Sequence, residues 1–175
     1  ARNMSTRVTT PASIRLIWWP KKWARAIGRP SAARSRPRGV WRDHDVVLAK
    51  PQSYMNTSGG PVKQLMNAYG VKADHLIVIH DELDIDPGTI RVKFGGGHAG
   101  HNGLRSICDK LGTRDWFRVR CGIGRPPGRM PVVDWVLGRP KKEQADDFAQ
   151  ATHLASQAAL GLVTDGLEKT QQRFN

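Results

Sequence analysis

The sequence predicts a layered α/β domain, and three observations support this prediction. From Val46 onward, short apolar stretches alternate with stretches that have the helical period of about 3.6 residues. Polar residues gather directly after the expected strands, which places them together at one edge of a sheet. A chain of 175 residues with 39% hydrophobic composition is large enough for one domain with a sizeable core.

The expected elements follow one another from Val46 to the end of the chain. An amphipathic helix begins after Ser58, a favourable capping residue, and ends at Gly70. A second helix is closed by Gly112, and the apolar spacing from about Glu143 onward predicts a mostly helical remainder. The expected strands have compact apolar or alternating patterns and cover residues 46–50, 76–80, 89–94 and 117–124.

The first 42 residues differ in composition from the rest of the chain. The formal net charge is +13, but residues 1–42 hold 11 of the 28 Lys and Arg residues and none of the 15 Asp and Glu residues. Residues 43–175 are nearly neutral, so the basic character of the whole chain is weak evidence for a nucleic-acid partner. We therefore expect an aberrant basic segment at 1–42 and a folded α/β domain at 43–175.

Two further features of the sequence restrict its class. The longest apolar runs, such as Leu76–His80, are far too short to cross a bilayer, so we expect no membrane association. Cys108 and Cys121 lack CxxC spacing, which argues against a disulfide framework or a zinc ribbon. These observations favour a protein of the reducing cytoplasm.

Three polar loops follow expected strands and are candidates for one shared pocket: Tyr54–Asn56, His80–Asp84 and Gly95–Gly103. The glycine loop lacks the GK[ST] of a phosphate loop and the pattern of a dinucleotide site. It does allow close backbone approach and offers free amide donors near a helix start, which suits an anionic or strongly polar ligand.

A metal site is the alternative interpretation of this region, because histidine and carboxylate side chains are common ligands. Acidic residues between strands are more often solvated turn formers, and DIDPG has the composition of an ordinary turn. We therefore expect neither a metal nor another cofactor. The residues concerned are His80, Asp81, Asp84, Asp86, His98 and His101.

Four stretches together resemble the bacterial peptidyl-tRNA hydrolase family: KPQSYMNTSG, IVIHDELDIDPGTIRVKFGGGHAGHNGLRSI, FRVRCGIGRPPG and VLGRP. The resemblance covers residues 46–140 and continues loosely to the end of the chain. It implies a single domain with three layers, in which a mixed, twisted sheet is flanked by helices. It also implies a monomeric enzyme without a metal, which cleaves the ester between peptide and tRNA and recycles tRNA from prematurely released chains.

The resemblance assigns roles to individual residues. Asp81 would be the carboxylate that orients a catalytic histidine, which acts as general base on water. Asn56 would supply an amide donor beside the ester carbonyl, and Asn102 would bind the substrate backbone or the water. Tyr54 and Met55 would line the path of the peptide or of the terminal adenosine.

Basic residues match the family positions that bind tRNA phosphates, namely Arg91, Lys93 and Arg120, with Arg105 as a further candidate. A substrate this highly charged is held mostly through its backbone, which suits arginine and lysine. Solvated surface charge remains the alternative interpretation of each of these side chains.

The resemblance fails at the amino end. The family begins with an apolar strand leading to GNPG, followed by YxxTRHNxGF, whose histidine is the base; neither motif is present here. We therefore expect the N-terminal strand to be missing from the sheet. Val8 stands at the position of the base, so the chain as printed is expected to be inactive.

Our hypothesis for the missing family motifs is a shift of the reading frame in the first 40 or so residues. Tryptophan has a single codon, so regrouping the codons around Trp18, Trp19 and Trp23 by one nucleotide allows LVAEEMG, a good amphipathic helix end. The same shift permits RHNAGF from residues 7–13. Two function classes remain open: a peptidyl-tRNA hydrolase with a garbled amino end, and a non-catalytic tRNA-binding module.

Overall fold

The structure is a computed structural model that describes residues 15–18, 38–50, 53–138 and 142–175. Its centre is a six-stranded sheet with the order β2-β3-β1-β4-β6-β5. Strands β3, β1, β4 and β6 run parallel, and the outer strands β2 and β5 are antiparallel to their neighbours. The strands are β1 (Arg15–Trp18), β2 (Arg38–Trp41), β3 (His44–Ala49), β4 (Leu76–Glu82), β5 (Ile90–Phe94) and β6 (Phe117–Gly122).

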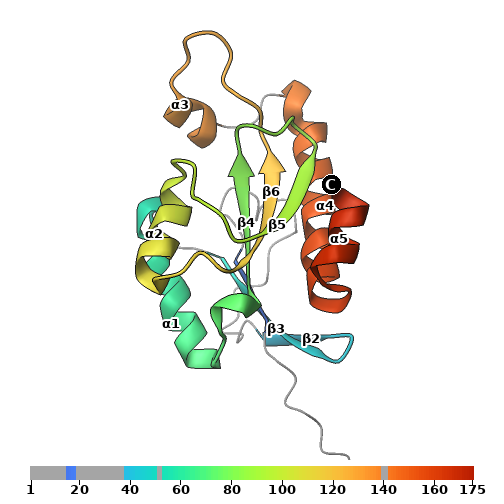
Figure 1. The fold of residues 1–175 in the computed structure, drawn as a ribbon. Coiled ribbons are helices and arrows are strands. Elements are labelled where there is room, and N and C mark those ends of the chain that lie inside the picture. The colour runs from blue at the N-terminus through green and yellow to red at the C-terminus, as the bar shows by residue number, and fades with distance from the viewer. Residues whose placement is uncertain (1–14, 19–37, 51–52, 139–141) are drawn as a thin grey trace, which may run out of the picture.

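Helices cover both faces of the sheet. Figure 1 shows α1 and α2 on one side and α4 and α5 on the other, so the domain has three layers and the predicted α/β class with a mixed sheet is confirmed. The helices are α1 (Gly59–Tyr69), α2 (Asn102–Leu111), α3 (Val132–Leu137), α4 (Ala145–Thr164) and α5 (Gly166–Phe174). Short 3₁₀ turns lie at η2 (Met55–Thr57), η3 (Ala73–His75) and η4 (Lys142–Gln144).

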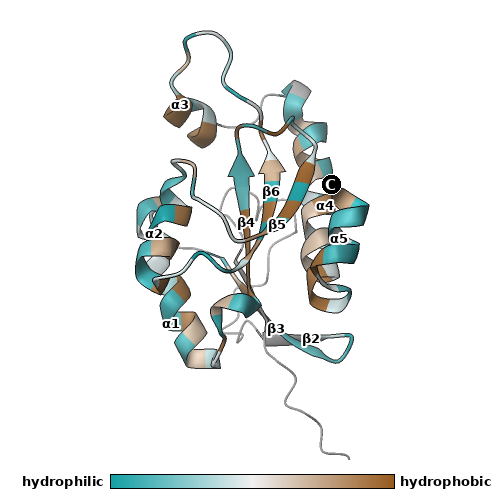
Figure 2. Ribbon diagram, in the orientation of Figure 1, coloured by the Kyte–Doolittle hydropathy of each residue, from teal (hydrophilic) through white to brown (hydrophobic). Residues whose placement is uncertain are grey.

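Strand β4 shows why the sequence forms a central strand here. Leu76 and Val78 join the core beneath α1 and α2, whereas Ile77 and Ile79 join the core beneath α4 and α5. Side chains alternate between the two faces of a strand, so a strand that is buried on both faces needs a continuous apolar run. Figure 2 shows the corresponding hydrophobic colour along the strands and on the inner sides of the helices.

The expectation that the N-terminal strand is missing is wrong. Arg15–Trp18 forms β1 in the middle of the sheet, where Leu16 pairs with Val47 of β3 and with Leu76 of β4. Arg38–Trp41 also pairs, as β2, with β3. The strand RLIW contains two aliphatic residues, Leu16 and Ile17, and its backbone groups supply the partners that the inner edges of β3 and β4 need.

The remaining predictions for the first segment concern residues 1–14 and 19–37, which lie outside the described residues. The reading-frame hypothesis and the boundary at residue 42 therefore stay predictions.

Helix ends agree with the sequence in part. Gly70 and Gly112 adopt the left-handed conformation, with φ of 66° and 70°, that closes α1 and α2. Ser58 does not cap α1 with its side chain; its hydroxyl instead lies 3.9 Å from the sulfur of Met55. The capping contact of α2 comes from His101, as described below.

Side chains near the end of the chain form hydrogen bonds with the free backbone groups of the outer strand β5. The side-chain amide of Asn175 accepts a hydrogen bond from the Val92 N–H at 2.7 Å and donates to the Val92 carbonyl at 2.9 Å. Gln171 also donates to that carbonyl, at 3.0 Å. Helix α5 is thereby attached to the edge of the sheet (Figure 1).

In the part of the chain that the structure describes, no helix combines the length and the hydrophobicity needed to span a bilayer.

Candidate active site

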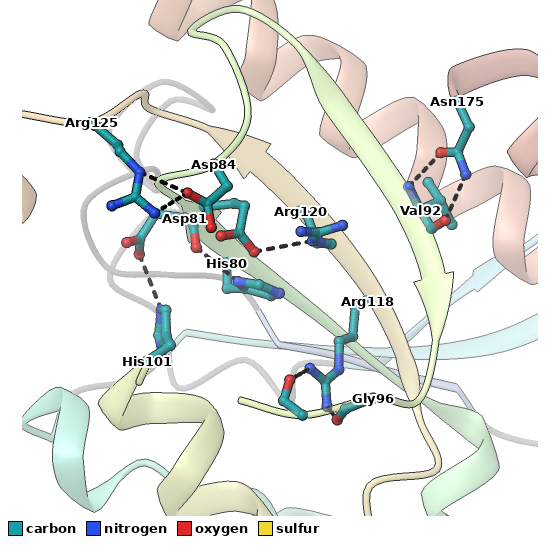
Figure 3. Close-up of polar contacts among 12 residues, drawn as sticks. His80, Asp81, Asp84, Val92, Gly96, His101, Arg118, Arg120, Arg125 and Asn175 are labelled. Atoms are coloured by element: carbon teal, nitrogen blue, oxygen red, sulfur yellow. Dashed lines mark hydrogen bonds and ion pairs between the residues drawn. The ribbon is translucent and has the colours of Figure 1, made fainter. Parts of the chain in front are cut away.

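His101 connects the end of β4 to the start of α2. Its Nε2 lies 3.3 Å from Oδ1 of Asp81 (Figure 3). Its Nδ1 accepts hydrogen bonds from the backbone N–H groups of Gly103 and Leu104 at 3.1 and 3.2 Å. Because Nδ1 accepts, the proton of the neutral ring is on Nε2 and is donated to Asp81. Both ring nitrogens are thus occupied, and no lone pair is left to take a proton from water.

Asp81 is an ionised carboxylate in a largely buried position. Its side chain is 13% exposed. Burial by itself would raise the pKa of Asp81, but the hydrogen bond from His101 and the electrostatic interactions with His101 and His80 lower it below the ordinary value. The site therefore holds a fixed negative charge beside His101.

His80 is a second buried histidine next to this pair. It is 4% exposed, its Nδ1–H donates to the backbone carbonyl of Asp81 at 2.8 Å, and its ring meets that of His101 edge-on with centroids 5.3 Å apart. Burial, followed by the electrostatic interaction with His101, lowers the pKa of His80 to about 3, so the ring is neutral at physiological pH. Its Nε2 has no hydrogen-bond partner among the described residues.

Residues of all three predicted polar loops meet in one cavity. The cavity has a volume of about 10 Å³, room for about one water molecule. Met55 reaches it from the first loop, and its sulfur would lie 2.6 Å from a side chain at Gly103, so the glycine is what allows this approach. The lining residues are Met55, Ser58, Val78, Ile79, His80, Asp81, His101, Gly103, Leu104 and Ile107.

The other predicted residues of the site lie beside this cavity and do not line it. Tyr54 is 85% exposed, and Asn56 is exposed in η2, next to Met55. Asn102 is the exposed first residue of α2, and its side-chain oxygen accepts a hydrogen bond from Arg105 at 2.9 Å. Each asparagine directly follows a residue that lines the cavity, so both side chains are accessible to a large ligand that reaches the site from solvent.

Basic side chains form a strip along one face of β5 and β6. Arg91 pairs across the strands with Arg120, and Lys93 pairs with Arg118. The alternate residues of both strands point to the opposite face and belong to the core under α4. Like charges directly opposite each other cost about 0.2–1 kcal/mol per pair, so the strip is a stability cost. We call these four residues the basic strip.

The charges of the basic strip are only partly compensated. Arg120 donates to Glu82 at 3.1 Å. Partial burial and the charges of Arg120 and Arg118 lower the pKa of Lys93. Arg105 does not belong to the strip, because it lies on α2 and binds Asn102. Three of the four predicted phosphate-binding residues thus share one face of the sheet with Arg118.

The sequence alone does not reveal the roles of two residues. As a sequence feature, His101 is a possible metal ligand and a member of the glycine loop, although its place directly before an expected helix is also a capping position. Arg118 gives no signal, because a charged residue in an alternating strand is normally exposed. Among the described residues, no group of three His, Cys, Asp or Glu side chains is arranged to hold a metal ion.

The fold places the chain in the class of single-domain α/β proteins with a mixed sheet between two layers of helices. A crystal structure of peptidyl-tRNA hydrolase from Acinetobacter baumannii superposes with a TM-score of 0.79 at 30% identity and covers 94% of this chain and 95% of that one. The family model for peptidyl-tRNA hydrolase matches residues 22–175. The chain belongs to the peptidyl-tRNA hydrolase family, as the resemblance predicted.

Two curated relatives, both peptidyl-tRNA hydrolases, agree with this assignment. The protein from Pseudarthrobacter chlorophenolicus is 48% identical over 130 residues, which cover 74% of this chain and 66% of that protein. The protein from Streptomyces coelicolor is 47% identical over 149 residues, which cover 85% of this chain and 70% of that protein. The chain thus spans about two thirds of the length of these relatives.

The buried neutral His80 predicts that acid destabilises the fold. The pKa of His80 is about 3 in the folded state and 6.5 when unperturbed, so between these values the unfolded chain binds the extra proton. The free energy of unfolding should therefore decrease as the pH falls below 6.5, by up to about 1.4 kcal/mol per pH unit from this residue. Urea unfolding between about pH 4.5 and 7.5 measures this slope.

The matched variants for this experiment are His80→Asn and His153→Asn. Asparagine at position 80 keeps a donor for the Asp81 carbonyl and does not titrate, so it should flatten the slope. His153 is exposed on α4, and its replacement should leave the slope unchanged. If His80→Asn retains the wild-type pH dependence, burial of His80 is not its source.

Proposed function

We propose that the site around Asp81 is built to hydrolyse the ester that joins a peptide to tRNA, and that the protein, when its amino end is in frame, recycles tRNA in the cytoplasm as a monomer. One observation carries this proposal. An ionised carboxylate at the end of a central strand lies near two exposed asparagine residues and a strip of partly compensated cations. The carboxylate can orient a base, the asparagines can donate hydrogen bonds to an ester, and the cations can hold phosphates.

The roles follow from chemistry. An ester is cleaved when a base takes a proton from the attacking water and donors stabilise the oxyanion that forms. The Asn56 amide is proposed to donate to the ester carbonyl, and Asn102 to hold the water or the substrate backbone. Tyr54 and Met55 are proposed to contact the peptide or the terminal adenosine. Asp81 would orient the base with the oxygen that His101 does not occupy.

The base is the part of this mechanism that the described residues do not supply. His101 uses one ring nitrogen to cap α2 and the other to bind Asp81. His80 is buried, and a pKa of about 3 makes it a very weak base. Neither ring can act on a water at the site as it stands. We therefore propose that the chain as printed binds tRNA without hydrolysing the ester, and that an in-frame amino end would supply the missing histidine.

The alternative is a tRNA-binding module that has no catalytic role in any form of the gene. The basic strip favours it, because the strip is complete in this chain even though neither His80 nor His101 is free to act as the base. Resequencing the DNA that encodes residues 1–45 distinguishes the two proposals. A histidine codon in the shifted frame supports the hydrolase, and an unshifted reading supports the binding module.

The first prediction here concerns the printed chain. Purified protein should release peptide from an N-acetylated aminoacyl-tRNA no faster than buffer alone, while still binding the tRNA. The assay contains a chelator and compares the protein with a relative that carries the family motif. Robust hydrolysis by the printed chain would show that a different residue of this chain acts as the base.

The second prediction concerns Asp81 in a version of the chain whose first 42 residues are replaced by an in-frame family segment. Asp81→Asn should lower kcat by about 100-fold or more, because it removes the charge that orients the base. The affinity for tRNA should stay nearly unchanged. Asp84→Asn is the matched control, because Asp84 lies in the same loop and forms an exposed ion pair with Arg125. Normal kcat with weak tRNA binding in Asp81→Asn would contradict the assigned role.

The third prediction concerns the basic strip. Lys93→Glu or Arg120→Glu should weaken tRNA binding and lower the slope of log K against log salt by about 0.9 for each phosphate that is no longer bound. Lys169→Glu makes the same change of charge on α5, on the other side of the sheet, and should have a much smaller effect. An unchanged slope in the strip variants would exclude these two residues from phosphate binding.

A further inference from the structure

Arg118 occupies an unusual position for a cation. It is 1% exposed, and its guanidinium lies beneath the glycine loop, where Nη1 donates to the Gly97 carbonyl at 2.6 Å and Nη2 donates to the Gly96 carbonyl (Figure 3). The guanidinium also lies over the ring of Trp116, 5.2 Å from its centroid. Arg118 belongs to the basic strip by its position on β6, but its buried guanidinium is not open to a phosphate from solvent.

Burying this guanidinium costs free energy that a simpler side chain would avoid. Its hydrogen-bond acceptors are two neutral carbonyls, and its Nε has no partner among the described residues. It also faces Lys93 across the strands. An apolar residue of similar size would fill the same space without this penalty. What an apolar residue could not do is bind two successive carbonyls with a rigid, planar fork.

The planar guanidinium of Arg118 determines the direction in which the amide groups of the glycine loop point. In a trans peptide the C=O and the N–H of one peptide unit point in opposite directions, and no cis peptide is present among the described residues. The Gly96 and Gly97 carbonyls point inward to Arg118, so the N–H groups of Gly97 and His98 point outward, away from the core. No hydrogen bond within the described residues uses these two N–H groups.

A third donor lies beside this pair. A side chain built at Gly96 would come within 2.7 Å of the Lys93 ammonium nitrogen, which places that ammonium against the loop. Gly96 has a φ of 96°, a conformation that other residues rarely adopt. Two aligned amide N–H groups and one ammonium, with no acceptor among them, are suited to an anion.

We propose that Arg118 is a positioning residue, which fixes the glycine loop so that the N–H groups of Gly97 and His98 bind an RNA phosphate together with Lys93. The inference rests on the proposed function for the nature of the ligand. It assigns the contact to the backbone of the loop, next to the basic strip, and it explains why a buried arginine lies at this point of β6.

The direct test is nuclear magnetic resonance of the printed chain with inorganic phosphate as the probe, at constant ionic strength. The amide protons of Gly97 and His98 should move downfield and saturate. In Arg118→Lys, which keeps the charge but loses the fork, this shift should disappear. A shift that is absent in the wild type, or that is equal in Arg118→Lys, overturns the proposal.

The second test measures the affinity for deacylated tRNA in variants that preserve the net charge. Arg118→Lys and Gly96→Ala should each weaken binding by roughly tenfold, the value of one hydrogen-bonded charged contact, and lower the salt slope by about 0.9. Gly96→Ala leaves Arg118 in place and acts through the left-handed φ and through displacement of the Lys93 ammonium. If Arg118→Lys does not fold, loss of the phosphate-induced shifts of the Gly97 and His98 amide protons in Gly96→Ala supports the inference, and unchanged shifts overturn it. Gly60→Ala, at a position with open space in α1, is the control.

The outcomes separate this inference from the proposed function. If tRNA binds in the wild type and neither charge-preserving variant changes the salt slope, the inference is wrong and the proposed function stands. If the wild type does not bind tRNA at all, the proposed function fails, whatever the phosphate titration shows. A lower affinity with an unchanged slope would indicate a general loss of structure and would also overturn the inference.

Discussion

The imidazole of His101 is the contact on which the geometry of the site depends. One ring nitrogen accepts from the first backbone N–H groups of α2, and the other donates to Asp81 at the end of β4. A single planar ring therefore fixes the distance between a helix on one layer and a strand in the next. It also fixes the place of Asn102, the residue that follows it. The carboxylate keeps its charge in a nearly buried position because this donor offsets the cost of desolvation.

In this arrangement the residues proposed to bind tRNA are different from the group that would take the proton. The groups that would hold tRNA, in the basic strip and the glycine loop, lie within residues 91–120 and are complete. The group that would take a proton has to come from elsewhere, because the two histidines that touch Asp81 are already bonded or buried. The like-charge pairs Arg91–Arg120 and Lys93–Arg118 also favour an anionic ligand. Without such a ligand, replacing one residue of each pair by a neutral one would stabilise the sheet.

Much of the site can be predicted because parallel strands bring their ends together. The order of the parallel strands places Asp81 and the loop after β3 at one edge, and the family resemblance adds Asn56 and Asn102. The glycine loop could not be placed in this way. Strand β5 is antiparallel to β6, so the loop leaves the sheet at the opposite edge, beside Phe117, and returns to Asp81 through His101. The central strand Arg15–Trp18 cannot be predicted, because its four residues are held by backbone pairing, and neighbours in space, not periodicity, decide that. The burial of Arg118 cannot be predicted for a related reason. Its burial depends on a loop that returns over β6, which the sequence of β6 does not record.

The contact of Asn175 with β5 affects whether the outer strand can pair with a strand of another chain. An outer strand exposes a row of backbone groups that can pair with the strand of another chain. At Val92 a side-chain carboxamide takes up both groups, and because a carboxamide carries the same donor and acceptor as a peptide unit, it acts as a strand one residue long. The row of free backbone groups on β5 is therefore interrupted at Val92, near the middle of the strand. A strand from another chain would find these two groups already bonded to Asn175, at the end of α5. The edge beside the basic strip is thereby less open to pairing with a strand of another chain.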